Sequence, residues 1–252
     1  MTGLAIPASA AYDILPCAVG NKWQYDTVKI TRASIQHQGR PLASMRDASS
    51  GLSTYEIASV DTQVNPAVYE YSETVTMRSG SGPEETDKVQ LAITVGPDGM
   101  RILSTYQEPS GDEKPEKQIY DPPLLYYSPA AASGSAWQVG TTRDGETKTV
   151  LAARGANRET ITVPAGTFKD CLKVIYSSDD ISGTIQMWEK TFTITAGRSR
   201  GIYWIADGVG VVKELEVSTS IAETAGPDGK PVTVEAATCV VSELKPGYVV
   251  KK

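Results

Sequence analysis

The sequence has few of the side chains from which most catalytic and metal sites are built. Its 252 residues include one histidine, His37, and three cysteines, Cys17, Cys171 and Cys239. These residues are isolated along the chain, so their spacing does not resemble a zinc site. The sequence also has no Gly-x-Ser-x-Gly elbow and no glycine-rich loop that opens a helix. We therefore expect no enzyme activity, no metal and no cofactor.

The sequence also has no cluster of basic residues and no long apolar segment. The 24 basic residues are outnumbered by 30 acidic ones and lie scattered along the chain, so we expect no nucleic-acid partner. No apolar run approaches the ~20 residues that span a bilayer, so we expect no transmembrane segment of the chain's own. The adjacent acids Asp179 and Asp180 indicate a solvated turn, and His37 indicates a solvated loop.

Residues 4–11 end in the small-x-small pattern that signal peptidase prefers, but few apolar and no basic residues precede it. We interpret residues 1–11 as the remnant of an export signal, with an ordinary leader as the alternative. The expected location is then the periplasm or the extracellular space, with membrane association only through partners. Residues 12–252 are expected to form a single β-domain, which could comprise two sheet halves joined near 121–135.

Short segments of strand type recur along the chain with turn signals between them. Four turn sequences should each reverse a hairpin: 96–99 and 226–229, both Gly-Pro-Asp-Gly, 164–166 and 207–208. Polar stretches such as 39–53 are expected to be loops, and 121–129 is expected to cross between sheet halves because prolines flank it. This pattern predicts an all-β antiparallel meander with few helices, in the form of a strongly curved open sheet, a half-barrel or a barrel.

Strand alternation places Cys171 and Cys239 on the faces opposite the expected core. A disulfide between Cys171 and Cys239, on neighbouring strands, is the favoured pairing. Three unpaired thiols are the alternative, and Cys17 could pair with either of the others.

Aromatic side chains share faces on three expected strands, near 22–31, 184–195 and 201–206. If these faces converge, they line the inside of a curved sheet, either as a filled core or as a partly open apolar pocket. The candidate ligand-binding residues are Trp23, Tyr25, Trp188, Phe192 and Trp204.

Several motifs together resemble one family of exported bacterial proteins. They are the Gly-x-x-Trp-x-Tyr opening at 20–25, Pro-Pro-Leu-Leu at 122–125, the Val-Pro-Ala-Gly-Thr-Phe hairpin from 163, and Gly-Val-Gly-x-Val-Lys at 208–213. The chain is similar to the TapB-like relatives of a domain of unknown function, which include exported proteins and lipoproteins. The resemblance implies a fold like that of the lipoprotein carriers LolA and LolB, a half-barrel around an apolar concave face.

Two functions follow as hypotheses. The first is a non-enzymatic accessory or scaffold component of a cell-envelope complex, acting through contacts with other envelope proteins. The alternative is a periplasmic binder or carrier of a lipid or another apolar ligand in the concave face.

Overall fold

In the computed structural model almost the whole described chain is β-strand. The structure describes residues 16–108, 114–144, 146–187 and 190–251. The strands are β1 Lys22–His37, β2 Arg40–Asp61, β3 Val68–Ser79, β4 Glu84–Gly96, β5 Gly99–Glu108, β6 Glu116–Tyr127, β7 Ala136–Asp144, β8 Thr147–Val163, β9 Gly166–Met187, β10 Lys190–Ala206, β11 Gly210–Ala225 and β12 Pro231–Leu244. One 3₁₀ helix, η1 Pro129–Ser133, joins β6 to β7. No helix among these residues is long and apolar enough to cross a membrane.

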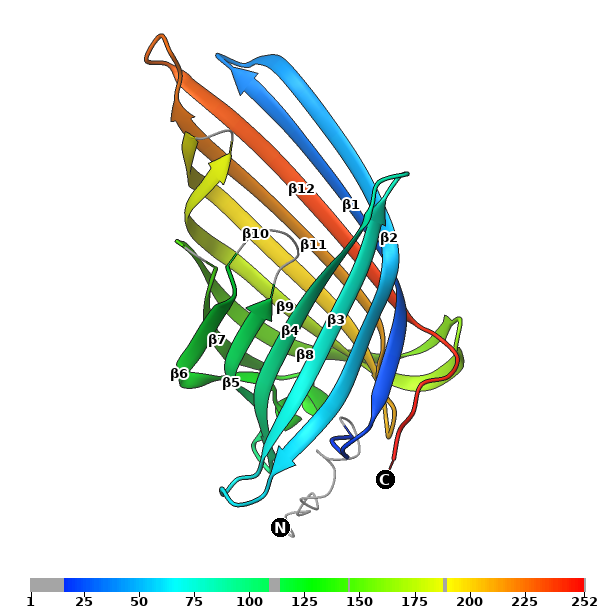
Figure 1. Ribbon diagram of the computed structural model, residues 1–252. Coiled ribbons are helices and arrows are strands. Elements are labelled where there is room, and N and C mark those ends of the chain that lie inside the picture. The colour runs from blue at the N-terminus through cyan, green and yellow to red at the C-terminus, as the bar shows by residue number, and fades with distance from the viewer. Residues whose placement is uncertain (1–15, 109–113, 145, 188–189, 252) are drawn as a thin grey trace.

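All twelve strands belong to one antiparallel sheet in the order β6-β5-β4-β3-β2-β1-β12-β11-β10-β9-β8-β7. The first and last strands pair in the middle, and the two edges, β6 and β7, are consecutive in the chain. Figure 1 shows the sheet curling into a nearly closed barrel shape in which β1, β2, β11 and β12 extend beyond the shorter β5, β6 and β7. The all-β antiparallel fold that the sequence predicts is confirmed.

Side chains close much of the remaining gap between the edges. Trp137 of β7 donates from Nε1 to the carbonyl of Leu125 in β6, at 3.0 Å. The Tyr176 hydroxyl of β9 donates to the carbonyl of Tyr126, at 2.6 Å. Two carbonyls of β6 are therefore bound by side chains of β7 and β9, although no backbone ladder joins β6 to β7 in the described part of the chain.

The four predicted hairpin turns are confirmed. β4 pairs with β5 up to Gly96–Gly99, and β8 pairs with β9 up to Val163–Gly166. Turn 226–229 joins β11 to β12 and is closed by a hydrogen bond from Gly229 N to the Gly226 carbonyl, at 3.0 Å. In the turn after Asp207, Gly208 has φ +73°, a conformation that glycine adopts without steric cost.

Three sequence-based boundaries are wrong. Residues 40–53, expected to be a loop, form the first part of β2, because they pair with β1 along their length. Residues 121–127, expected to be a crossing, belong to β6, which tolerates Pro122 and Pro123 because it is an edge strand. The expected strand 184–195 contains the end of β9 and the start of β10.

Strand β9 also breaks the alternation that the sequence suggested. Asp170 has φ +53° and the β8–β9 register shifts nearby, as in a β-bulge. The bulge turns Phe168 to the face of Cys171. Cys171 itself lies on the face opposite Leu172, as expected, but it is fully buried there because it packs with Val163 and Trp204. The proposed disulfide is also wrong: Cys171 and Cys239 are free, and strands β10 and β11 lie between β9 and β12.

The prediction of an export remnant at 1–11 lies outside the described residues.

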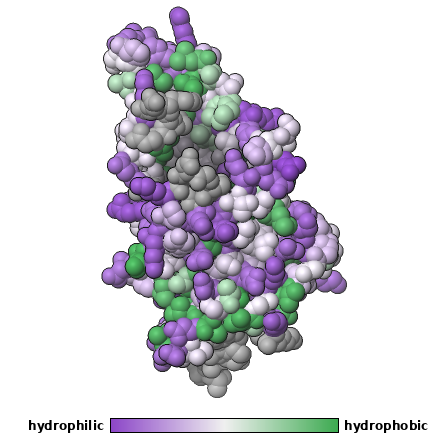
Figure 2. All heavy atoms as spheres, in the orientation of Figure 1, coloured by the Kyte–Doolittle hydropathy of each residue, from purple (hydrophilic) through white to green (hydrophobic). Residues whose placement is uncertain are grey.

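Over the face shown in Figure 2, hydrophilic and hydrophobic residues are mixed, and hydrophobic residues gather toward its lower end.

Candidate functional site

A cavity of about 320 Å³ lies within the curve of the sheet. Eight strands and the segment before β1 supply its walls. Its lining residues are Pro16, Cys17, Trp23, Tyr25, Tyr55, Ile57, Tyr71, Glu73, Leu91, Ile93, Met100, Ile102, Tyr126, Tyr203, Val211, Glu214 and Glu216. The wall thus combines aliphatic and aromatic side chains with three carboxylates.

Strand pairing explains why these residues meet. Residues directly opposite one another in an antiparallel pair point to the same face. Trp23 pairs with Tyr55, and Tyr55 pairs in turn with Glu73, so β1, β2 and β3 present one row to the cavity. On the other side Tyr203 of β10 pairs with Glu214 of β11. The inner face of the sheet therefore carries aromatic rings and carboxylates in register.

The aromatic rings of the cavity form two groups, one on each side. The Tyr25 and Tyr55 rings meet edge to face at a centroid distance of 5.2 Å. The centroid of the Tyr71 ring lies 5.7 Å from that of Tyr55 and 6.5 Å from that of Trp23. On the other side of the cavity, the centroids of the Tyr126 and Tyr203 rings lie 6.4 Å apart. Contacts of this kind orient each ring through its neighbours.

Two of these rings are also anchored by hydrogen bonds. Trp23 Nε1 donates to the Val209 carbonyl at 2.6 Å, and the Tyr25 hydroxyl donates to the Val211 carbonyl at 2.7 Å. Val209 lies in the turn just before β11 and Val211 lies at the start of β11, so β1 is bound to a strand that it does not pair with. The polar ends of Trp23 and Tyr25 are therefore satisfied within the protein, and their rings remain to face the cavity.

The three carboxylates lie on facing walls. Glu214 and Glu216 follow one another on the inner face of β11, and Glu73 comes from β3. The Tyr203 hydroxyl donates to Glu216, and Glu73 lies directly opposite Tyr55 in the β2–β3 pairing. Among the described residues, no lysine, arginine or histidine forms an ion pair with any of the three.

Burial without a cationic partner changes the acidity of these groups. Burial, and next the neighbouring Glu216, raise the pKa of Glu214 well above its usual value. Burial raises the pKa of Glu73 as well, although the neighbouring Tyr55 hydroxyl opposes the shift. Desolvation disfavours the charged form of an acid, and a like charge adds to the effect.

We expect Glu214→Gln to raise the free energy of unfolding of the ligand-free protein by about 1 kcal/mol at pH 8, because it removes a poorly solvated charge. The Glu214 pKa is higher in the folded state, so wild-type stability falls as pH rises from the usual glutamate range through that raised pKa. The gain should therefore vanish below pH ~4, where the glutamate is protonated in both states. Urea unfolding at several pH values measures it. An equal gain at all pH values would contradict the explanation.

The predicted ligand-binding residues lie in different places. Trp23 and Tyr25 line the cavity. Trp204 does not, because its neighbour Tyr203 points inward and Trp204 points to the other face, where its Nε1 donates to Glu159 at 2.8 Å. Phe192 packs in a separate buried cluster with Ile194, Ala222 and Val234. Trp188 lies outside the described residues.

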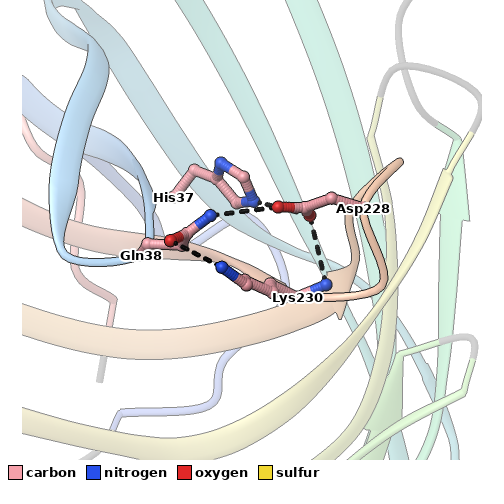
Figure 3. Close-up of polar contacts among 4 residues, drawn as sticks. All are labelled: His37, Gln38, Asp228 and Lys230. Atoms are coloured by element: carbon pink, nitrogen blue, oxygen red, sulfur yellow. Dashed lines mark hydrogen bonds and ion pairs between the residues drawn. The ribbon is translucent and has the colours of Figure 1, made fainter.

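The candidate polar residues lie away from the cavity. His37, expected in a solvated loop, ends β1, and its Nε2 lies 3.0 Å from Asp228 Oδ1. Figure 3 shows that Gln38 and Lys230 complete this cluster, which joins the β1–β2 turn to the β11–β12 turn. The backbone N–H of Lys230, and next His37, lower the pKa of Asp228. Asp179, expected in a turn, lies in β9 and pairs with Arg198.

Sequence reasoning missed most of the cavity wall. In β3 the sequence Tyr-Glu-Tyr-Ser-Glu places Tyr69, Tyr71 and Glu73 on one face, and this alternation could have identified a carboxylate within an aromatic row. In β11 the alternation is misleading, because Leu215 and Val217 look like the core-facing residues. The register shift between β10 and β11 next to Val212 instead turns Glu214 and Glu216 inward.

The sequence matches no described protein family and no curated protein. Among solved structures, one similar chain is a candidate lipoprotein of Parabacteroides distasonis. It is 17% identical, with a TM-score of 0.36, over 92% of this chain and 98% of that chain. Another is a candidate exported protein of Bacteroides fragilis with a YmcC-like fold, 14% identical, with a TM-score of 0.30, over 95% and 99% of the two chains. The TapB-like resemblance therefore stays a prediction.

Proposed function

We propose that this chain is a non-enzymatic exported protein that binds a small organic molecule inside its curved sheet. The observation that supports this function best is the cavity. Its volume of about 320 Å³ lies at the lower end of the ~300–1,000 Å³ usual for ligand pockets. Its wall is mainly aliphatic and aromatic, with a few polar groups, which is the usual composition of such pockets.

The cavity also has features of a preformed site. The anchored rings of Trp23 and Tyr25 hold part of the wall in place before any ligand arrives. A preformed wall reduces the ordering cost of binding. The buried residues that fill the rest of the interior, among them Tyr127, Leu172 and Val174, give this part of the sheet a packed support.

Binding can be tested by closing the cavity. Met100 lines it, whereas Met45 on β2 is 57% exposed. With the neutral dye Nile red as probe, we expect Met100→Trp to weaken binding by at least ~tenfold, since the indole would occupy the space of the ligand. The matched control Met45→Trp should bind like the wild type. Equal loss of dye binding in both variants would contradict a ligand site in this cavity.

A second candidate function, contact with envelope proteins, is favoured by the outer face of the sheet. Directly paired residues form an apolar row across five neighbouring strands: Val28, Val241, Leu215, Ile202 and Ile175. Val28 is 44% exposed, so part of this row faces solvent. Native mass spectrometry of the protein from its source membrane separates the two functions. A bound small molecule favours the cavity, and a co-purifying protein favours the outer face.

A further inference from the structure

We propose that the ligand of the cavity is an organic cation, an amine or a quaternary ammonium compound. Its charge would lie among Glu73, Glu214 and Glu216, and its body would lie against the tyrosine rings. This inference rests on the proposed binding function and adds the chemical class of the ligand.

The distribution of charge across the sheet is the first argument. On the outer face, Lys213 of β11 pairs with Glu243 at 2.7 Å, and Lys173 of β9 pairs with Glu159 at 2.9 Å. On the inner face, Glu214 and Glu216 of the same β11 have no such partner among the described residues. The chain thus supplies cations to the outer carboxylates and leaves the inner carboxylates for a cation from outside.

The aromatic wall is the second argument and is independent of the acids. The face of a tyrosine or tryptophan ring attracts a cation within about 6 Å of its centroid, and more strongly where water is excluded. Four rings of the cavity, those of Trp23, Tyr25, Tyr55 and Tyr71, lie in contact. No group among the described residues hydrogen-bonds the Tyr71 hydroxyl, so this hydroxyl can serve a ligand.

The same side chains disfavour the alternatives. An anionic ligand would be repelled by three carboxylates of the same sign. A wholly apolar ligand would remove water from these carboxylates and offer no hydrogen bond in return, which is costly. Within the described chain, no three acidic, histidine or cysteine side chains are arranged to hold a metal ion. An organic cation balances the charge and uses the rings together.

Access to the cavity agrees with this assignment. Glu216 is exposed, whereas Glu214 and Glu73 are half-buried, so a cation meets a solvated carboxylate first and a less solvated one next. Electrostatic attraction strengthens along this path because the surroundings become less polar. Because burial raises the pKa values of Glu214 and Glu73, cation binding should release protons from them.

The test compares choline with 3,3-dimethyl-1-butanol, which has the same shape with carbon in place of the charged nitrogen. We expect titration calorimetry of the full chain to show at least ~tenfold tighter binding of choline. We also expect Glu214→Gln and Glu73→Gln to weaken choline binding by at least ~tenfold. The matched control Glu85→Gln, an exposed residue of β4, should have no effect. Titration in buffers of different ionisation enthalpy should detect the released protons.

Equal affinity for the two probes, or full choline binding by both cavity variants, would overturn the cationic assignment. Nile red separates this failure from failure of the binding function. If the dye still binds and Met100→Trp blocks it, the cavity is a ligand site for another chemical class. If neither the dye nor choline binds, the proposed function fails as well.

Discussion

Replacing Gly155 with alanine is expected to lower the free energy of unfolding by about 3 kcal/mol, because the added methyl group would clash with neighbouring backbone atoms in a well-packed interior. A Cβ at this position of β8 would lie 1.9 Å from the Ala131 carbonyl oxygen and 2.6 Å from its carbon. Ala131 belongs to η1 and is fully buried among interior residues such as Ile93 and Leu124. The added methyl group would therefore push η1 away from the core.

Chemical denaturation followed by circular dichroism measures this loss. Gly96→Ala is a suitable control, because the backbone there does not have positive φ and no atom lies within 4 Å of the added Cβ. We expect the control to change the free energy of unfolding by less than ~1 kcal/mol. A loss below ~1 kcal/mol in Gly155→Ala would mean that η1 does not pack tightly on β8, and that the connection between the edge strands adapts easily.

Replacing Phe192 with alanine is expected to cost about 3–5 kcal/mol through the void that the lost ring leaves. Phe192 is 1% exposed and packs with Ile194, Ala222 and Val234. Because this cluster does not contribute to the cavity, the folded fraction of the variant should bind Nile red like the wild type. Urea unfolding, followed by dye titration at equal folded fraction, measures both quantities.

The other phenylalanine of the chain gives the comparison. Phe168 is half-buried at the β8–β9 hairpin, 6.5 Å from the Tyr248 ring. Its replacement by alanine should cost about 1–2 kcal/mol, because a partly exposed ring loses less on truncation. If Phe192→Ala abolished dye binding while costing little stability, Phe192 would belong to a ligand site, as the sequence first suggested, and not to the core.

The faces of the strands show where sequence reasoning fails. Period-two alternation is reliable only while the register is unbroken, and a β-bulge shifts every later residue to the opposite face. The bulge near Asp170 moves Phe168 to the face opposite Leu172, and the bulge near Val212 turns Glu214 and Glu216 inward. Trp23 and Tyr25 were placed together because residues 22–25 of β1 pair with β2 without a register shift.

The sequence by itself determined the fold class and the positions of four hairpins. Turn residues such as those at 96–99 and 226–229 act locally, through backbone conformations that only certain side chains allow. Tertiary structure alone decided which carboxylates share a cavity with which rings. Glu73 and Glu214 are far apart in the chain and meet only because the first and last strands pair and the sheet curls around. Such contacts depend on register and curvature summed over many strands, and no local pattern encodes them.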